Sequence, residues 1–374
     1  MHTYLVTGAA GFIGSNFVKY MLKKHDDIRI VVLDALTYAG YLGTIDADID
    51  NRRCFFHKGD IRDAKLVDDL FSTYQFDYVV NFAAESHVDR SIENPQLFLE
   101  TNILGTQTLL DAARKHWVIG KDAQGYPEWR AGVRFHQVCT DEVYGSLGAE
   151  GYFTEETPLS PHSPYSASKA SADFITIAYR DTYHMPISIS RCSNNYGPYQ
   201  FPEKLIPLII RNILSHKSLP VYGKGLNVRD WLYVADHCKA IDMIVSEAKD
   251  GSIYTVGGHN EMRNIDIVHL IISTIHDIME NEPQYRALLP EGDRDDLSWI
   301  SNDLITYVAD RLGHDQRYGI DPTKIKNDLG WYPETPFAKG IVLTIRWYLD
   351  NPDWVAAVTG SDYQAYYEKM YANR

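Results

Sequence analysis

The feature that most constrains the fold is a glycine-rich turn near the N-terminus. Residues 3–7 have the composition of a short buried strand, and Gly8, Gly11 and Gly14 follow at once. Residues 15–24 then show apolar side chains at helical spacing. In a strand–turn–helix unit of this kind, backbone N–H groups and the helix dipole point toward an anion. The sequence therefore predicts a pyrophosphate site at this turn.

A carboxylate at the end of the second predicted strand extends this site. Residues 29–33 read as a strand that ends at Asp34, about twenty residues past the last glycine, where an acid binds a ribose 2′-hydroxyl in dinucleotide-binding folds. A negative charge at this position repels a 2′-phosphate, so NAD is favoured over NADP as the cofactor. The glycine spacing G-x-x-G-x-x-G resembles that of the extended short-chain dehydrogenase/reductase superfamily.

Strands and helices alternate along the next part of the chain. Such alternation is typical of α/β proteins with a doubly wound, parallel sheet of the Rossmann type, in which ligands bind at the carboxyl ends of the strands. The motifs described here all fall at such ends. Further strands are predicted at residues 54–58, 77–82, 133–139 and 186–191, and helices at residues 64–74, 95–116, 234–246 and 265–278.

Two short motifs carry groups suited to proton transfer. Tyr165 and Lys169 lie one turn apart on one face of a predicted helix, where the ammonium favours the phenolate and makes Tyr165 a base near neutral pH. Thr140, Asp141 and Glu142 place two carboxyl groups beside a hydroxyl, directly after a predicted strand. A simple alcohol dehydrogenase has no use for the acid pair. An enzyme that oxidises a sugar, eliminates water and then reduces the sugar again needs one.

Longer blocks around these motifs resemble one enzyme family, the dTDP-glucose 4,6-dehydratases. The resemblance rests first on AESHVDRS at residues 84–91, TDEVYG at residues 140–145 and YSASK at residues 165–169. Together, the blocks run over nearly the whole chain. The remaining blocks are RCSNNYGP, FPEKLIP, RDWLYV and DRLGHD, at residues 191–198, 201–207, 229–234 and 310–315.

The resemblance implies a three-step mechanism on dTDP-glucose. Tyr165 as phenolate removes the proton of the 4-hydroxyl while C4 gives hydride to NAD, Thr140 bonds the same oxygen, and Lys169 holds the nicotinamide ribose and lowers the pKa of Tyr165. Glu142 then removes the C5 proton, and protonated Asp141 donates to the departing 6-hydroxyl. Hydride returns to C6, so NAD is regenerated in each turnover and stays tightly bound. The product is dTDP-4-keto-6-deoxyglucose.

The resemblance also implies which other residues bind the two ligands. Cofactor contacts are expected at the glycine turn, at the ends of the following strands, and at the catalytic Tyr and Lys. Substrate contacts are expected from residues that enclose the nucleotide, including Thr140. The remaining expected cofactor contacts are Phe12, Ile13, Leu36, Thr37, Asp60, Ile61, Phe82, Ala83, Ala84, Thr101 and Asn195, and the remaining substrate contacts are Ser86, Asn194, Lys204, Leu205, Pro220, Tyr222, Arg229, Asn264, Asp310, Arg311 and His314.

Two domains are expected from this distribution of motifs. An NAD-binding Rossmann domain is assigned to residues 1–193 plus 228–258, and a smaller C-terminal α/β domain that binds the nucleotide sugar to residues 194–227 plus 259–374. The polar segment 118–131 is predicted to be a surface loop. Homodimerisation through a helical bundle is implied by the resemblance alone.

Charge and composition exclude several classes of partner. The formal net charge of −14 argues against a nucleic-acid partner, and no apolar run is long enough for a membrane span. The N-terminus does not read as a signal peptide, and the four cysteines lack CxxC or metal-ligand spacing. The sequence thus predicts a cytoplasmic protein with buried free thiols and no metal.

Three alternatives stay open at this point. A dehydratase that acts on UDP-glucose would share these motifs. A nucleotide-sugar 4-epimerase of the same superfamily keeps the Tyr, Lys and Thr but lacks the acid pair, so Asp141 and Glu142 argue against it. A non-catalytic NAD-binding regulator on this fold commonly loses the Tyr or the Lys, and this chain has both.

Overall fold

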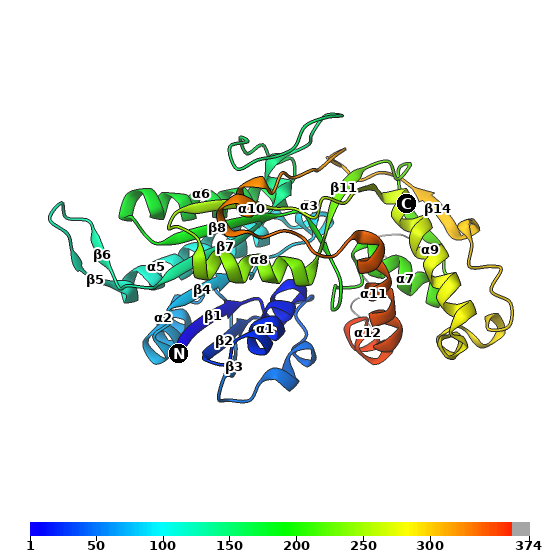
Figure 1. Cartoon of the computed structure of the whole chain (residues 1–374), viewed down its shortest axis with the longest axis horizontal. Coiled ribbons are helices and arrows are strands. Elements are labelled where there is room, and N and C mark those ends of the chain that lie inside the picture. The colour runs from blue at the N-terminus through cyan, green and yellow to red at the C-terminus, as the bar shows by residue number, and fades with distance from the viewer. Residues whose placement is uncertain (361–374) are drawn as a thin grey trace.

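A large parallel sheet forms the centre of the left-hand part of the molecule in Figure 1. The computed structural model describes residues 1–360, and among these residues seven strands form this sheet in the order β12-β8-β7-β4-β1-β2-β3. All neighbouring strands pair in parallel. The chain winds outward from β1 in both directions, which confirms the predicted doubly wound α/β fold. The strands are β1 (His2–Thr7), β2 (Ile28–Asp34), β3 (Cys54–Lys58), β4 (Tyr78–Asn81), β7 (Arg134–Thr140), β8 (Ile187–Cys192) and β12 (Ser252–Val256).

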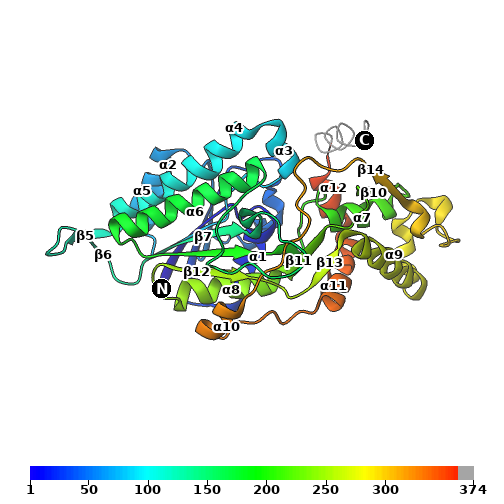
Figure 2. The same cartoon turned by 90° about the horizontal axis from the view of Figure 1, so that it is seen from above.

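Helices cover both faces of this sheet because its buried strands are apolar on both sides. Along β1, Leu5 enters the core under one layer of helices, and Tyr4 and Val6 enter the core on the other side. Figure 2 shows α2, α5 and α6 along one side of the sheet and α8 along the other, where α1 packs beside it. The helices are α1 (Phe12–Lys24), α2 (Ala64–Tyr74), α5 (Gly105–Trp117), α6 (Pro164–Tyr183) and α8 (Val234–Glu247).

The helix predicted at residues 95–116 is interrupted by a π-helical turn. α4 (Pro95–Phe98) leads into the π-helical segment η3 (Leu99–Leu104), and α5 follows. Asn102 in this turn is buried; its amide donates to the Glu85 carbonyl oxygen at 3.0 Å and to Ser168 Oγ at 2.8 Å. π-turns often occur at functional sites. Here the turn ties the loop after β4 to the helix that carries Tyr165.

A β-hairpin occupies the segment predicted to be a surface loop. β5 (Val118–Lys121) and β6 (Pro127–Trp129) pair antiparallel and project from the left end of the molecule in Figure 1. Asp122 Oδ1 accepts from the backbone N–H groups of Gln124 and Tyr126, which closes the turn. The short, polar strands show no apolar alternation, so the sequence pattern could not reveal them.

A second group of elements builds the other end of the molecule around its own apolar core. Its strands form a three-stranded sheet, β13-β11-β9, and a parallel pair, β10-β14. The core lies between α7, α9 and α11 and is rich in isoleucine. These elements are β9 (Asn194–Tyr196), α7 (Leu205–Leu214), β10 (Leu219–Tyr222), β11 (Val228–Tyr233), β13 (Glu261–Arg263), α9 (Asn264–Asn281), β14 (Ile305–Val308) and α11 (Phe337–Asp350).

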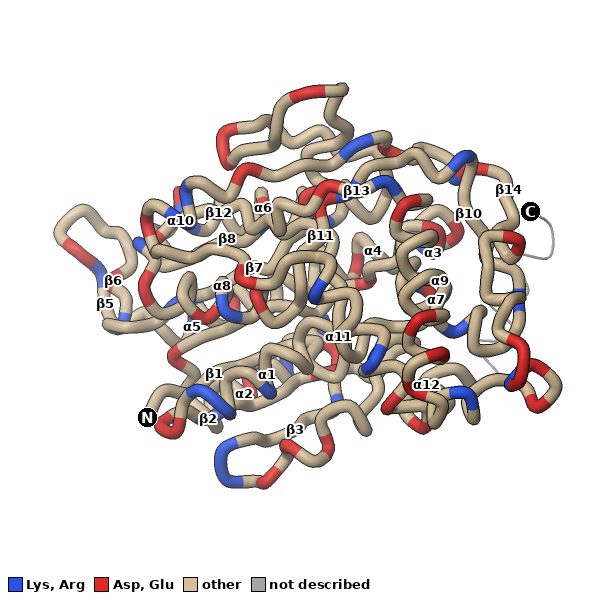
Figure 3. The backbone as a smooth tube through the Cα atoms, turned by 45° about the vertical axis from the view of Figure 1, so that its right-hand side comes forward, with Lys and Arg blue, Asp and Glu red and all other residues tan. Residues whose placement is uncertain are grey.

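Short elements complete the described chain. No helix among residues 1–360 is long and apolar enough to cross a membrane. Acidic and basic residues are scattered along the backbone at both ends of the molecule (Figure 3). The short elements are η1 (Leu42–Thr44), η2 (Asp46–Asp48), α3 (Val88–Glu93), η4 (Asp141–Tyr144), η5 (Pro283–Leu288), η6 (Glu291–Asp293), η7 (Asn302–Leu304), α10 (Thr323–Leu329) and α12 (Pro352–Val358).

A buried ion pair joins three elements around the predicted catalytic motifs. Arg191 Nε in β8 donates to Asp173 Oδ2 in α6 at 2.9 Å, and both side chains are buried. Arg191 Nη1 also donates to the Tyr144 hydroxyl in η4 at 3.0 Å. Burial raises the pKa of Asp173, and the Arg191 guanidinium opposes that rise. The pair therefore fixes the strand, the helix and the turn relative to one another.

Arg191→Met is expected to lower the free energy of unfolding by about 3–5 kcal/mol, because it leaves the Asp173 carboxylate buried without its partner. Urea denaturation followed by circular dichroism measures this change. The double variant Asp173→Leu/Arg191→Met removes both charges and should recover more than half of the loss. Equal losses in the single and double variants would contradict this account.

Candidate active site

The glycine turn forms one wall of a cavity of about 330 Å³ at the carboxyl edge of the sheet. Gly8 has a φ of +68°, and a Cβ on it would lie 2.7 Å from the backbone nitrogen of Ala83. A Cβ on Gly14 would lie 2.6 Å from the Gly8 carbonyl oxygen. Gly11 is the N-cap of α1 and supplies no side-chain cap, so the first N–H groups of this helix remain suited to an anion.

Asp34 lies at the end of β2, in the same cavity, and is buried. Its Oδ2 accepts from the Ala10 N–H and its Oδ1 from the Leu36 N–H, both at 2.8 Å. Burial raises the pKa of this carboxyl, and the two backbone hydrogen bonds oppose the rise. The carboxylate therefore holds the glycine turn and the loop after β2 together. Its position at the strand end fits a ribose hydroxyl, so the glycine cradle and this acid together fit NAD.

The structure gathers nearly all of the expected cofactor residues around this cavity. Leu36 is the exception: it does not line the cavity, and its backbone serves Asp34 instead. The Asn195 side chain is fixed by His237 Nδ1 at 2.9 Å from its Oδ1. The expected residues that line the cavity are Gly8, Gly11, Phe12, Ile13, Gly14, Asp34, Thr37, Asp60, Ile61, Phe82, Ala83, Ala84, Thr101, Tyr165, Lys169 and Asn195.

The acid pair lies in the turn η4, directly after β7. Thr140 Oγ1 donates to Asp141 Oδ1 at 3.2 Å and accepts from the Glu142 N–H at 3.3 Å. Asp141 is only 1% exposed, and its Oδ2 has no hydrogen-bonding partner among the described residues. Burial raises the pKa of Asp141 well above its ordinary value, and the negative charges of Glu142 and Asp230 add to this rise. Burial thus favours the protonated form of Asp141, whereas Glu142 is half-buried in the cavity wall.

Tyr165 and Lys169 lie in the first turns of α6. This helix begins with a capping box at Ser163 and has Pro164 in its first turn, which fixes its start. Lys169 Nζ donates to the Val138 carbonyl oxygen at 2.8 Å. Burial raises the pKa of Tyr165 well above its ordinary value, and the Glu142 charge adds to it. The net shift of the Tyr165 pKa is therefore opposite in direction to the lowering expected from Lys169 alone.

A second cavity of about 190 Å³ adjoins the first. Glu142, Asn194, Glu203 and Lys204 line both cavities. Lys204 Nζ donates to the Ser86 carbonyl oxygen at 3.1 Å; burial lowers the pKa of Lys204, and the charges of Glu203 and Glu142 oppose this shift. Glu142 therefore stands where the two cavities meet, and Asp141 beside it lines the first cavity.

Polar atoms without partners point into the second cavity. Asn194 Oδ1, Asn264 Oδ1 and Trp231 Nε1 are buried and have no hydrogen-bonding partner among the described residues. Because buried polar groups are nearly always satisfied, such a cluster marks the place of a polar ligand. The expected substrate residues that line this cavity are Asn194, Lys204, Leu205, Pro220, Tyr222, Arg229, Asn264, Arg311 and His314.

Three expected substrate residues are placed differently. Ser86 and Thr140 line the first cavity, and Asp310 lines neither. Asp310 Oδ1 instead lies 2.6 Å from His314 Nδ1 and orients that ring. Arg229 lines the second cavity but also holds the protein together, since its Nη1 and Nη2 donate to the carbonyl oxygens of Val228 and Asp315, both at 2.8 Å.

The second cavity includes residues to which the sequence assigned no role. His87, Trp231 and Tyr318 line it, and the Arg229 guanidinium lies over the Tyr318 ring at 4.1 Å. His87 and Trp231 belong to the blocks AESHVDRS and RDWLYV, which were the only sequence signal for them. Among residues 1–360, no group of three or more His, Cys, Asp or Glu side chains could hold a metal ion, and all four cysteines are buried as free thiols.

Comparison with known proteins agrees with this geometry. The family model described as GDP-mannose 4,6 dehydratase matches residues 5–344. The dTDP-glucose 4,6-dehydratase of Xanthomonas campestris pv. campestris (strain B100) is 48% identical, over 97% of this chain and 98% of its own, and that of Shigella flexneri is 47% identical over 99% of both.

Solved structures give the same result. A dTDP-glucose 4,6-dehydratase from Bacillus anthracis in complex with NAD is 43% identical with a TM-score of 0.80, covering 96% of this chain and 100% of that one. DesIV, the dTDP-glucose 4,6-dehydratase of Streptomyces venezuelae, with NAD and TYD bound, is 41% identical with a TM-score of 0.81, covering 95% and 99%. The chain belongs to the dTDP-glucose 4,6-dehydratase family, within the group that the GDP-mannose 4,6-dehydratase model describes.

Proposed function

We propose that this protein is a lyase that converts dTDP-glucose to dTDP-4-keto-6-deoxyglucose and water, with NAD regenerated in each turnover. The observation that carries the proposal is the acid pair at the junction of the two cavities. Asp141 is buried, which raises its pKa and favours its protonated form, and Glu142 is half-buried beside it. Two carboxyl groups whose surroundings separate their proton affinities can serve as acid and base in one elimination.

The first step oxidises C4 of the glucose. Bound NAD accepts the hydride from C4, later returns it to C6, and brings a positive ring charge that favours the Tyr165 phenolate. Tyr165 takes the proton of the 4-hydroxyl, and Thr140 donates a hydrogen bond to the same oxygen. Lys169 holds the ribose of the cofactor through its ammonium group. The cradle of Gly8 and Gly14 keeps the dinucleotide in place throughout the cycle.

The second step eliminates water across C5 and C6. The 4-keto group acidifies the C5 proton, and Glu142 removes it. Asp141 gives its proton to the departing 6-hydroxyl, which leaves as water. C6 then receives the hydride while C5 is reprotonated, so the oxidation state of the cofactor is the same at the end of the cycle as at the start.

We further propose the two-domain division given above. The pairing of β12 with β8 and the packing of α8 against the large sheet support the assignment of residues 234–258 to the NAD-binding domain. Residues 228–233 form β11, which pairs with β9 and β13 at the other end of the molecule. The separate core around α7, α9 and α11 supports a substrate domain made mainly of residues 194–227 and 259–374. We also place the protein in the cytoplasm.

The experiment that tests the function uses purified protein with no added cofactor. It is incubated with dTDP-glucose and, in parallel, with UDP-glucose, and 4-keto-6-deoxy product is followed by its alkali-induced absorbance. Product from dTDP-glucose alone is expected, since NAD stays bound. Equal turnover of UDP-glucose would favour the UDP-glucose dehydratase, and no product from either sugar, even with NAD added, would favour a 4-epimerase.

Glu142→Gln is expected to stop elimination while still allowing slow NADH formation, because the C4 oxidation does not need the base at C5. Product formation by the alkali assay and NADH absorbance in a single turnover measure the two steps separately. Glu150→Gln, which alters an exposed glutamate after the same turn, is the matched control. Wild-type turnover by Glu142→Gln would show that the base lies elsewhere.

Asp141→Asn is expected to reduce kcat at least about hundredfold, because the amide cannot donate the proton to the leaving hydroxyl. The same change should stabilise the fold. The raised pKa of Asp141 means that folding takes up a proton above the unfolded-state pKa of about 3.9, which costs free energy that grows as pH rises toward the folded pKa. The stability gain of Asp141→Asn should therefore grow between pH 4 and neutrality, as measured by urea denaturation. A loss of stability at neutral pH would contradict the neutral form of Asp141.

We propose that the protein is a homodimer formed through the outer faces of η3 and α6. Leu99 and Leu104 in η3 and Phe174 in α6 are 46%, 53% and 56% exposed, and these two elements pack side by side. Apolar side chains gathered on adjacent helices are typical of a helix-to-helix interface between subunits.

Phe174→Glu is expected to shift the protein to a monomer, because it places a charge in this apolar contact. Light scattering coupled to gel filtration measures the mass. Tyr152→Glu changes an equally exposed aromatic residue in a different loop and should leave the dimer intact. A dimer that persists in Phe174→Glu would place the interface on another surface.

A further inference from the structure

The segment after β14 runs from the substrate side of the molecule back toward α10 on the catalytic side (Figure 1). Arg311 and His314 in this segment line the second cavity. Three residues past His314, Arg317 forms an isolated bridge with Val228 of β11. We call residues 310–318 the strap. The strap carries Arg311 and His314 and also contacts the segments next to the catalytic elements.

Asp315 is the point at which the strap is fixed. Asp315 is 7% exposed, and both oxygens of its carboxylate have hydrogen-bonding partners. Oδ1 lies 2.6 Å from His162 Nδ1, and Oδ2 accepts from the Tyr318 hydroxyl at 2.5 Å. Its backbone oxygen accepts from Asn227 Nδ2 at 3.0 Å and from Arg229 Nη2 at 2.8 Å. The side chain therefore reaches toward the catalytic side, while the backbone is held from the substrate side.

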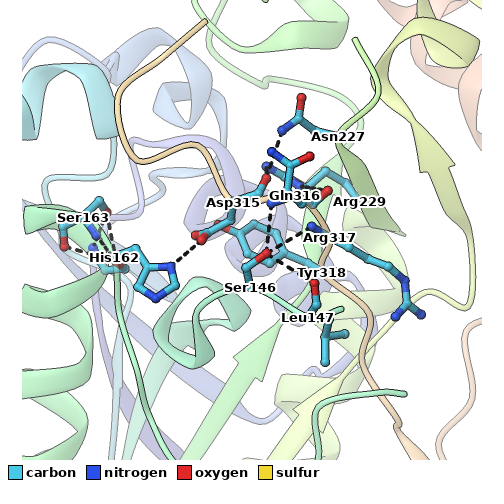
Figure 4. Close-up of polar contacts among 11 residues, drawn as sticks. Ser146, Leu147, His162, Ser163, Asn227, Arg229, Asp315, Gln316, Arg317 and Tyr318 are labelled. Atoms are coloured by element: carbon cyan, nitrogen blue, oxygen red, sulfur yellow. Dashed lines mark hydrogen bonds and ion pairs between the residues drawn. The ribbon is translucent and has the colours of Figure 1, made fainter. Parts of the chain in front are cut away.

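The contact with His162 leads directly to the catalytic helix. His162 precedes Ser163, the N-cap of α6, and Tyr165 follows in the first turn of that helix. The side chain of His162 is 48% exposed, so packing alone does not hold it. The Asp315 carboxylate is the group that fixes the ring next to the helix start, as Figure 4 shows.

A second set of bonds joins the strap to the acid pair. Ser146 follows the turn η4, and its Oγ accepts from the N–H groups of Gln316 at 3.0 Å and Arg317 at 3.4 Å. The Leu147 N–H donates to the Arg317 carbonyl oxygen at 3.0 Å. The residues next to Asp315 are thus tied to the segment that carries Asp141 and Glu142.

We propose that Asp315 is a positioning residue of the dehydration: by joining His162 to Tyr318 and the strap, it fixes the distance between the nucleotide-binding side chains and Tyr165. The inference rests on the proposed function. A substrate bound through its nucleotide presents its hexose to the catalytic groups only at the spacing that the protein sets. A misplacement of about 1 Å can cost on the order of a hundredfold in rate.

The side chain and the backbone oxygen of Asp315 make separate contacts. Substitution of the side chain should therefore lower kcat without weakening the binding of dTDP. A change of its side chain removes the links to His162 and to the Tyr318 hydroxyl but keeps the backbone bonds from Asn227 and Arg229. His162→Ala removes only the first of these two links. The nucleotide-binding side chains should therefore stay in place, and only their register with α6 should loosen. Asp315→Ala and His162→Ala are each expected to lower kcat about tenfold to a hundredfold.

The test measures kcat and KM for dTDP-glucose together with the Kd of dTDP by calorimetry. We expect the Kd of dTDP to change by less than about threefold in both variants. His162→Asn keeps a donor near the position of Nδ1 and should retain most of the wild-type kcat. Asp321→Asn is the matched control, because this aspartate lies shortly after the strap and, within residues 1–360, its carboxylate bonds only to Thr323.

Each outcome decides for or against the role of Asp315. Low kcat with an unchanged Kd for dTDP, an unchanged thermal midpoint and rescue by His162→Asn supports it. Wild-type kcat in both alanine variants overturns it. It is also overturned if kcat and the capacity to bind dTDP both fall in proportion to the fraction of protein that remains folded. His162→Ala remains informative even if Asp315→Ala fails to fold, since His162 is half exposed. Turnover of dTDP-glucose by the wild-type protein in the same assay tests the proposed function separately.

Discussion

Parallel pairing of the strands is the constraint on which the rest of this molecule depends. Because each strand of the large sheet runs in the same direction as its neighbours, the residues that follow them emerge at one edge. Gly8 after β1, Asp34 at the end of β2 and Thr140 at the end of β7 are brought together in this way. The helices that return the chain also begin near this edge, so α1 and α6 present their N-termini to the same cavity. Topology thus fixes the place of the site, and side chains decide its chemistry.

Two neighbouring carboxyl groups differ in burial and therefore in their affinity for a proton. Asp141 and Glu142 are adjacent in sequence, yet the tight turn η4 directs one into the protein and leaves the other in the wall between the cavities. The ion pair of Arg191 with Asp173 stiffens the surroundings of this turn through Tyr144. A small difference in direction at the end of one strand therefore places two carboxyl groups in different surroundings, as their proposed roles of acid and base require.

Local patterns predicted much of the fold and less of the site. The strand Cys54–Lys58 and the helix Ala64–Tyr74 have the predicted bounds, because their apolar periodicity is strong and local. The hairpin of β5 and β6 and the π-turn η3 were missed, since polar strands and a widened helical turn leave no such period. The sequence blocks contained His87 and Trp231, but no spacing rule says that their side chains share a cavity. The direction of the Tyr165 pKa shift could not be predicted from the sequence either, because it depends on burial by residues distant in sequence.

The wall shared by the two cavities has a consequence for ligand design. Glu142, Asn194, Glu203 and Lys204 face both sites, so one molecule could extend from the dinucleotide site into the nucleotide-sugar site. Once one half of such a bisubstrate compound is bound, the other half is present at an effective concentration on the order of millimolar. Many proteins bind either half alone. The length of the linker would then have to match the separation of the two cavities in this protein.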